Sequence, residues 1–186
     1  MPQTEEIIDI VLRIKNAFKK GKIHKLRKIH NECTKELVLT NNPILLDMAL
    51  ISYALAKLIE KPRYRDIHIK KFAPILEDNL DRVAQALKTN EMNEYNRAIK
   101  EITEAATKME SADRRYIRII FDKARLKLAS TIYAQGFSLG YASEISGVSR
   151  RDILDYVGKT MIPDRVKTEK TIDERLKNVR ELFRKK

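Results

Sequence analysis

Apolar side chains recur every three or four residues along nearly the whole chain, and this spacing constrains the fold more than any other feature. It places Ile7, Val11 and Phe18 on one side of a helix, and the pattern resumes over residues 23–37 after a break near Gly21. Such spacing is typical of amphipathic α-helices, and no segment sustains the alternation of a half-buried strand. The 186 residues include only five Gly and five Pro. We therefore predict an all-α protein that is long enough to bury its own core.

Helix-terminus signals divide the N-terminal part of the chain into successive helices. Asn42 is placed to cap a helix that has Pro43 at its first position, and the apolar surface that follows predicts a buried central helix. Further helices are predicted over residues 65–88, with a kink or interruption at Pro74, and over residues 91–109 and 113–134. Short connections between helices favour antiparallel neighbours, so we expect an antiparallel bundle or a short helical-hairpin array.

A change in charge near Glu110 suggests a boundary between two domains. We predict a helical domain over residues 1–110 that serves dimerisation or partner binding. Residues 111–186 would form a second domain with a last helix, because Thr171 and Glu174 have the spacing of a capping box.

The stretch "SLGYASEISGVSRRDI" combines turn chemistry at three points. Ser138 is placed to cap one helix, Gly147 to end it in a left-handed conformation, and Ser149 to cap the next helix. This order predicts a helix-turn-helix unit, with the preceding helix as its third member. Small residues at the predicted crossing are Ala142, Ser143 and Ser146, and the predicted apolar seam comprises Ile145, Val148, Ile153, Leu154 and Val157.

The same region, about residues 126–163, resembles a family of small prokaryotic proteins predicted to be antitoxins. The matching positions are Tyr133, Gly136, Ser138, Leu139, Gly140, Ala142, Glu144, Gly147, Val148, Ser149 and Arg150. The short N-terminal strand of that family has no counterpart here, and a long helical region stands in its place. The resemblance implies DNA binding, with Arg150 and Arg151 at the start of the second helix, where recognition helices contact DNA.

The formal charge of +12 favours a polyanionic partner. Eight basic residues and no acidic one lie between Arg13 and Lys28, and a second basic run leads into the helix-turn-helix stretch. The predicted nucleic-acid contacts are Ser138, Ser149, Arg150, Arg151, Lys159, Arg114, Arg115 and Arg118, with a diffuse basic patch at Lys19, Lys20 and Lys22.

Two functions fit these features. The first is a DNA-binding transcriptional regulator or antitoxin-like protein, whose N-terminal helices bind a protein partner or form a homodimer. The second is a helical interaction protein that binds RNA or an acidic protein and uses the helix-turn-helix as a scaffold. Asp152 and Asp155 favour the second, because carboxylates that face phosphates repel them unless they accept from cytosine or pair with neighbouring arginines. The basic residues favour the first, with DNA preferred to RNA as the partner.

Other chemistry lacks a convincing pattern. His30 and Cys33 are three residues apart, but a closed metal site needs further ligands, so we expect a packed Cys33 beside a surface histidine. Glu77, Asp78 and Asp81 are expected to form a solvated acidic face. We find no glycine-rich phosphate loop, nucleophile elbow or catalytic triad, and therefore predict neither an enzyme nor a cofactor or metal.

The N-terminus and the single cysteine bear on location. The segment "MPQTEEIIDI" lacks the basic and then apolar order of a signal peptide, and no apolar run approaches the roughly 20 residues of a membrane span. One cysteine excludes an internal disulfide. We expect a cytoplasmic protein with no membrane partner.

Overall fold

The described part of the computed structural model comprises residues 4–60, 69–111 and 120–160, and it contains helices and no strands. This confirms the predicted all-α class. The helices are α1 (Thr4–Lys19), α2 (Ile23–Thr40), α3 (Pro43–Glu60), α4 (Ile69–Thr89), α5 (Met92–Ser111), α6 (Ile120–Ala134), α7 (Leu139–Ser146) and α8 (Arg150–Thr160).

The breaks between the first three helices follow the predicted terminus chemistry. Gly21, with a φ of 60°, separates α1 from α2. Asn41 ends α2 in the left-handed region, and its N–H donates to the carbonyl oxygen of Leu37 over 2.7 Å. The side chain of Asn42 then accepts a hydrogen bond from the N–H of Ile44 over 3.0 Å, which satisfies a donor at the start of α3.

Of the kink or interruption predicted at Pro74, the interruption is wrong because α4 continues through this residue, whereas the kink stays a prediction. Pro74 is exposed, so water can reach the carbonyl that loses its helical donor. Helix α4 packs against α5 and α1, and this packing supports it as one helix. The first four residues predicted for this helix, 65–68, lie outside the described residues.

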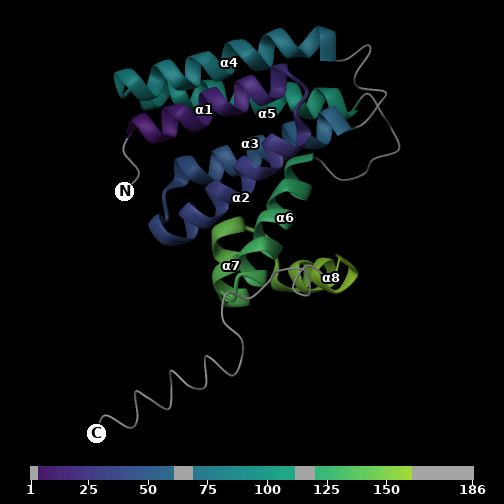
Figure 1. The fold of residues 1–186 in the computed structure, drawn as a ribbon. Coiled ribbons are helices and arrows are strands. Elements are labelled where there is room, and N and C mark those ends of the chain that lie inside the picture. The colour runs from purple at the N-terminus through teal and green to yellow at the C-terminus, as the bar shows by residue number, and fades with distance from the viewer. Residues whose placement is uncertain (1–3, 61–68, 112–119, 161–186) are drawn as a thin grey trace, which may run out of the picture.

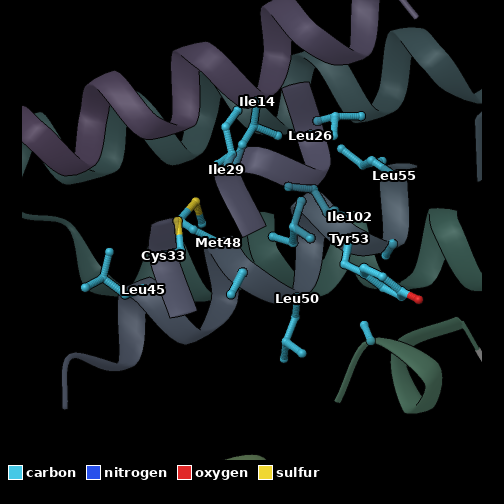
Figure 2. Packing of buried hydrophobic residues seen from close by; sticks show 14 of the residues in the cluster. Ile14, Leu26, Ile29, Cys33, Leu45, Met48, Leu50, Tyr53, Leu55 and Ile102 are labelled. Atoms are coloured by element: carbon cyan, nitrogen blue, oxygen red, sulfur yellow. The ribbon is translucent and has the colours of Figure 1, made fainter. Parts of the chain in front are cut away.

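Helix α3 is the centre of the N-terminal helices, as predicted. It packs against α1, α2, α5 and α6, and consecutive residues from Met48 to Ala56 are buried. A helix that is covered on all sides must be apolar on all sides. Figure 2 shows its labelled side chains, among them Met48 and Tyr53, together with those of the surrounding helices.

Figure 1 shows how the other helices surround this centre. The α4–α5 hairpin lies beside α1, the α2–α3 hairpin forms the next layer, and α6 leads away to α7 and α8. Helix α6 packs against α3 and α2 as well as against α7 and α8. It therefore contributes to the packing of both the N-terminal helices and the C-terminal unit. Within the described ranges, no helix is long and apolar enough to cross a membrane.

Candidate nucleic-acid interface

Helix α7 has the caps that its sequence predicts at both ends. The Ser138 hydroxyl oxygen accepts a hydrogen bond from the N–H of Tyr141 over 3.1 Å. At the other end Gly147 has a φ of 69°, and its N–H donates to the carbonyl oxygen of Ser143 over 2.9 Å. These two caps set the length of α7 at eight residues.

The turn between α7 and α8 is held by side-chain hydrogen bonds. The Ser143 hydroxyl donates to the carbonyl oxygen of Val148 over 2.7 Å, and the N–H of Val148 donates to the Ser146 hydroxyl oxygen over 3.2 Å. Ser149 then caps α8, accepting from the N–H of Asp152 over 3.1 Å and donating to its carboxylate over 2.8 Å. The turn consequently fixes where α8 begins and how it leaves α7.

Helices α6, α7 and α8 pack together as the predicted three-helix unit. Ala142, Ile153 and Val157 are buried in it, and the Arg125 guanidinium of α6 donates to the carbonyl oxygen of Ser146 at the end of α7 over 3.2 Å. One member of the predicted seam is wrong, because Leu154 is 48% exposed. Leu154 follows Ile153 directly, so it points about 100° away from that buried side chain on the same helix.

The N-terminal end of α8 presents exposed arginines. Arg150 and Arg151 are both exposed, and neither makes an ion pair with any residue that the structure describes. The Arg150 guanidinium lies over Gly140, where an added Cβ would come within 3.3 Å of Nη2. The same Cβ would be 3.8 Å from the Ser138 hydroxyl oxygen. Arg150 thus lies beside the first turn of α7, where helix N–H groups and the helix dipole also favour anions.

The two aspartates of α8 have different surroundings. Asp152 is half-buried and bonds to Ser149, so its carboxylate takes part in capping the helix. Asp155 is exposed. Lys159 is also exposed, but nine residues separate it from Arg150, or roughly 13 Å along a helix axis. The structure therefore brings Ser138, Ser149, Arg150 and Arg151 to one end of the unit and leaves Lys159 at the other end of α8.

Several predicted residues cannot be placed in this interface. Arg114, Arg115 and Arg118 lie outside the described residues, as does the capping box at Thr171 and Glu174. The relation of these three arginines to α8 stays a prediction.

The basic patch near the α1–α2 turn belongs to a different part of the molecule (Figure 1). Lys19 lies 3.8 Å from the Glu77 carboxylate of α4, and Lys15 lies 2.5 Å from that of Asp81. Two of the three residues predicted to form a solvated acidic face therefore make ion pairs with α1. Lys20 and Lys22 are exposed.

The expectation of a surface histidine beside Cys33 is wrong for His30, which is only 1% exposed. Helix α3 covers it: its Nδ1 donates to the carbonyl oxygen of Ala49 over 2.9 Å, and its ring lies 5.2 Å from that of Tyr53. Its Nε2 is buried and has no hydrogen-bond partner among the described residues. Burial is the main reason that the pKa of His30 falls to about 4, so the ring is neutral near pH 7.

Cys33 is buried, as predicted, and burial raises the pKa of its thiol to about 12. A thiol that stays protonated is a poor metal ligand. In the part of the chain that the structure describes, no three His, Cys, Asp or Glu side chains are grouped to hold a metal ion.

Sequence reasoning missed two features of the C-terminal unit. The first is the exposed Leu154 on the outer side of α8. The second is a link between α8 and α3, in which the Tyr156 and Tyr53 hydroxyls interact electrostatically and burial raises the pKa of both hydroxyls. The signal in the sequence was Tyr156, an aromatic residue three positions after the buried Ile153. It did not indicate that Tyr156 would meet Tyr53 of α3.

Comparisons with known proteins give no match to this chain, whether with protein-family models, with curated proteins or with solved structures. The resemblance to the predicted antitoxins consequently stays a prediction.

Proposed function

We propose that the protein binds DNA through α7 and α8, as a transcriptional regulator or an antitoxin-like protein. The observation that carries this proposal is the exposed pair Arg150 and Arg151 at the capped start of α8. The N-terminal residues of a recognition helix are the ones that contact base edges in the major groove. Arginine suits this position because its planar fork donates to both acceptors of guanine.

The surroundings of the two arginines suggest a division of labour. Arg150 lies beside Ser138 and the N-terminal turn of α7, which suits a phosphate contact that sets the register on the duplex. Arg151 and the exposed Leu154 lie further along α8. Arginine there suits guanine, and an apolar side chain there suits the methyl group of thymine.

A second function is favoured by the exposed Asp155 and Leu154, which also suit a protein partner. In that case α7 and α8 would be a scaffold, and the basic surface would bind RNA or an acidic protein. The two functions differ in how binding depends on Arg150 and Arg151.

The test uses a duplex selected from a random library by the full chain, together with an unrelated duplex of equal length. Arg150→Ala with Arg151→Ala should remove most discrimination between them, by roughly 1–3 kcal/mol for each base contact that is lost. Lys35→Ala with Lys88→Ala removes the same charge from exposed positions outside this site. This control should weaken the binding of both duplexes about equally.

Fluorescence anisotropy at several salt concentrations supplies the second measurement. The logarithm of affinity should fall with that of salt with a slope of roughly −4 to −7 if about five to eight phosphates are neutralised. Melting temperatures check that each variant is folded. Unchanged discrimination in the double arginine variant would favour the scaffold function.

A further inference from the structure

The α1–α2 hairpin encloses a basic cleft that the proposed DNA interface does not use. This α1–α2 cleft has a volume of about 330 Å³. Among the residues that the structure describes, its lining includes no acidic residue and five basic ones: Arg13, Lys20, Lys22, Lys25 and Lys28.

The cleft follows from the way the chain reverses between the two helices. Gly21 adopts a φ of 60°, and the N–H of Lys22 donates to the carbonyl oxygen of Ala17 over 2.8 Å. On α1, Arg13 and Ala17 are four residues apart and therefore share one side of the helix. On α2, Lys25 and Lys28 are three apart and also share a side. The tight turn holds these two sides together around one hollow.

Most of the positive charge in this cleft is left without a carboxylate. Arg13 pairs with Glu32 at 2.5 Å and with Asp9 at 3.8 Å, and Lys28 lies 3.9 Å from Glu32. The remaining cations are exposed and form no ion pair within the described ranges: Lys20, Lys22 and Lys25. Even with both carboxylates counted against it, the cleft keeps an excess of positive charge. An anionic ligand would relieve the repulsion among these lysines.

The floor of the cleft is apolar. Ala17 and Ile29 line it and are otherwise buried in the core. The volume falls at the lower end of the range of about 300–1,000 Å³ for small-molecule sites. A concave hollow of this size, with an apolar floor and a cationic rim, is matched by a compact ligand that has an apolar ring and several negative charges.

We propose that the α1–α2 cleft binds a small phosphorylated ligand of nucleotide size. Its phosphates would lie against Lys20, Lys22 and Lys25, and its ring against Ala17 and Ile29. This inference does not rest on DNA binding, because the described residues that line the cleft belong to α1, α2 and the turn between them.

The experiment is calorimetric titration of the full chain, at fixed ionic strength and without magnesium, with ATP as the probe. One ATP per chain should bind. Inorganic triphosphate should bind more weakly because it lacks the ring, and adenosine should bind least because it lacks the phosphates. Lys22→Ala with Lys25→Ala should weaken ATP binding by at least about tenfold, since each lysine is expected to make a charge-assisted contact.

The matched control is Lys35→Ala with Lys88→Ala, which removes the same charge from exposed positions on α2 and α4. ATP affinity should stay within about twofold in this control, and also in Arg150→Ala with Arg151→Ala. The second comparison separates this proposal from that of DNA binding. All the substituted side chains are exposed, and melting temperatures check folding.

Three outcomes would overturn the proposal. One is a wild-type chain that does not bind ATP. Another is an equal loss of ATP affinity in the two double lysine variants, because ATP binding would then depend only on the overall charge of the protein. The third is that Lys22→Ala with Lys25→Ala weakens the binding of an oligonucleotide but leaves ATP affinity unchanged, in which case the lysines contact a nucleic-acid backbone and not ATP.

Discussion

The α1–α4 face, which carries Lys15 and Lys19, and the α8 tip, which carries Arg150 and Arg151, both have clustered cations, but the surroundings of these cations differ. On the first, Lys15 and Lys19 lie against the carboxylates of Asp81 and Glu77. At the tip, Arg150 and Arg151 have no such partner among the described residues. The difference teaches that a run of basic residues does not by itself indicate a binding surface, because neighbouring helices decide how much of its charge is neutralised.

The two regions also differ in how they are stabilised. Helix α3 is buried along most of its length, whereas α7 and α8 bury few residues and rely on caps and turn hydrogen bonds. We therefore expect the free energy of unfolding to depend mainly on the N-terminal helices. Substitutions at the α8 tip should affect the stability of α7 and α8 more than that of the other helices.

The largest effect is expected from Leu55→Ala in α3. Leu55 is buried in the centre, so the change should leave a cavity and lower the free energy of unfolding by about 2–5 kcal/mol in urea denaturation. Leu39→Ala is the matched control, because Leu39 is 78% exposed and should change stability by less than about 0.5 kcal/mol. Equal effects of the two substitutions would contradict the central role of α3.

The next effect is a dependence of stability on pH that originates at His30. The folded-state pKa of about 4 lies below the ordinary value of 6.5, so the unfolded state binds more protons between them. Stability should be at its full value above about pH 6.5 and should be lost as pH falls through 4, by about 3 kcal/mol in total from this group.

Other groups titrate in the same range, so the measurement is the difference between the wild-type and His30→Gln stability curves over pH. The difference in the free energy of unfolding should change between about pH 6.5 and pH 4 and should be constant above and below this range. His24→Gln, an exposed histidine on the same helix, should retain the wild-type curve. A difference for His30→Gln that is constant with pH would show that His30 is not buried as a neutral ring.

A smaller effect is expected at the joint between the two regions. The Tyr141 hydroxyl of α7 donates to the carbonyl oxygen of Val38 at the end of α2 over 3.1 Å. Tyr141→Phe should cost roughly 0.5–1.5 kcal/mol, and amide hydrogen exchange should accelerate in α7 more than in α3. The control is Tyr133→Phe, because the Tyr133 hydroxyl makes no hydrogen bond within the described residues. Faster exchange throughout α3 would mean that this bond supports the whole protein.

The smallest effect is expected on the α1–α4 face. Asp81→Asn removes a surface ion pair with Lys15 and should lower stability by less than about 1 kcal/mol, with a weaker effect at high salt. Melting temperatures at low and high salt measure it. Asp78→Asn is the control, because this exposed aspartate on the same helix makes no ion pair with the described residues. A salt-independent loss would show that Asp81 acts other than by charge.

Local chemistry explains which parts of the fold could be predicted. Gly21, Asn42, Gly147 and Ser149 act on the backbone within a few residues of themselves, so the helix ends near them follow from sequence. Similarly, the burial of α3 could be predicted because its apolar surface is too broad to be covered by one neighbouring helix.

Contacts between one helix and another were harder to predict, even where the helices are neighbours in sequence. The burial of His30 depends on α3, and the convergence of lysines in the α1–α2 cleft depends on how one turn orients two helices. Periodicity shows that a side of a helix is apolar, but it does not show which neighbour covers it. Leu154 was misplaced for the same reason, since it adjoins the apolar side of α8 without belonging to it.

The double role of α6 has a consequence for handling the protein. Ala124, Leu128 and Ile132 are among its buried residues, and α6 packs against helices from both ends of the chain. A shortened polypeptide that begins at α6 would lack α2 and α3, and would leave an apolar strip open to water. Such a fragment should self-associate on a sizing column. Assays of the tip therefore need the intact polypeptide, and cutting the gene before α6 would yield an unsuitable sample.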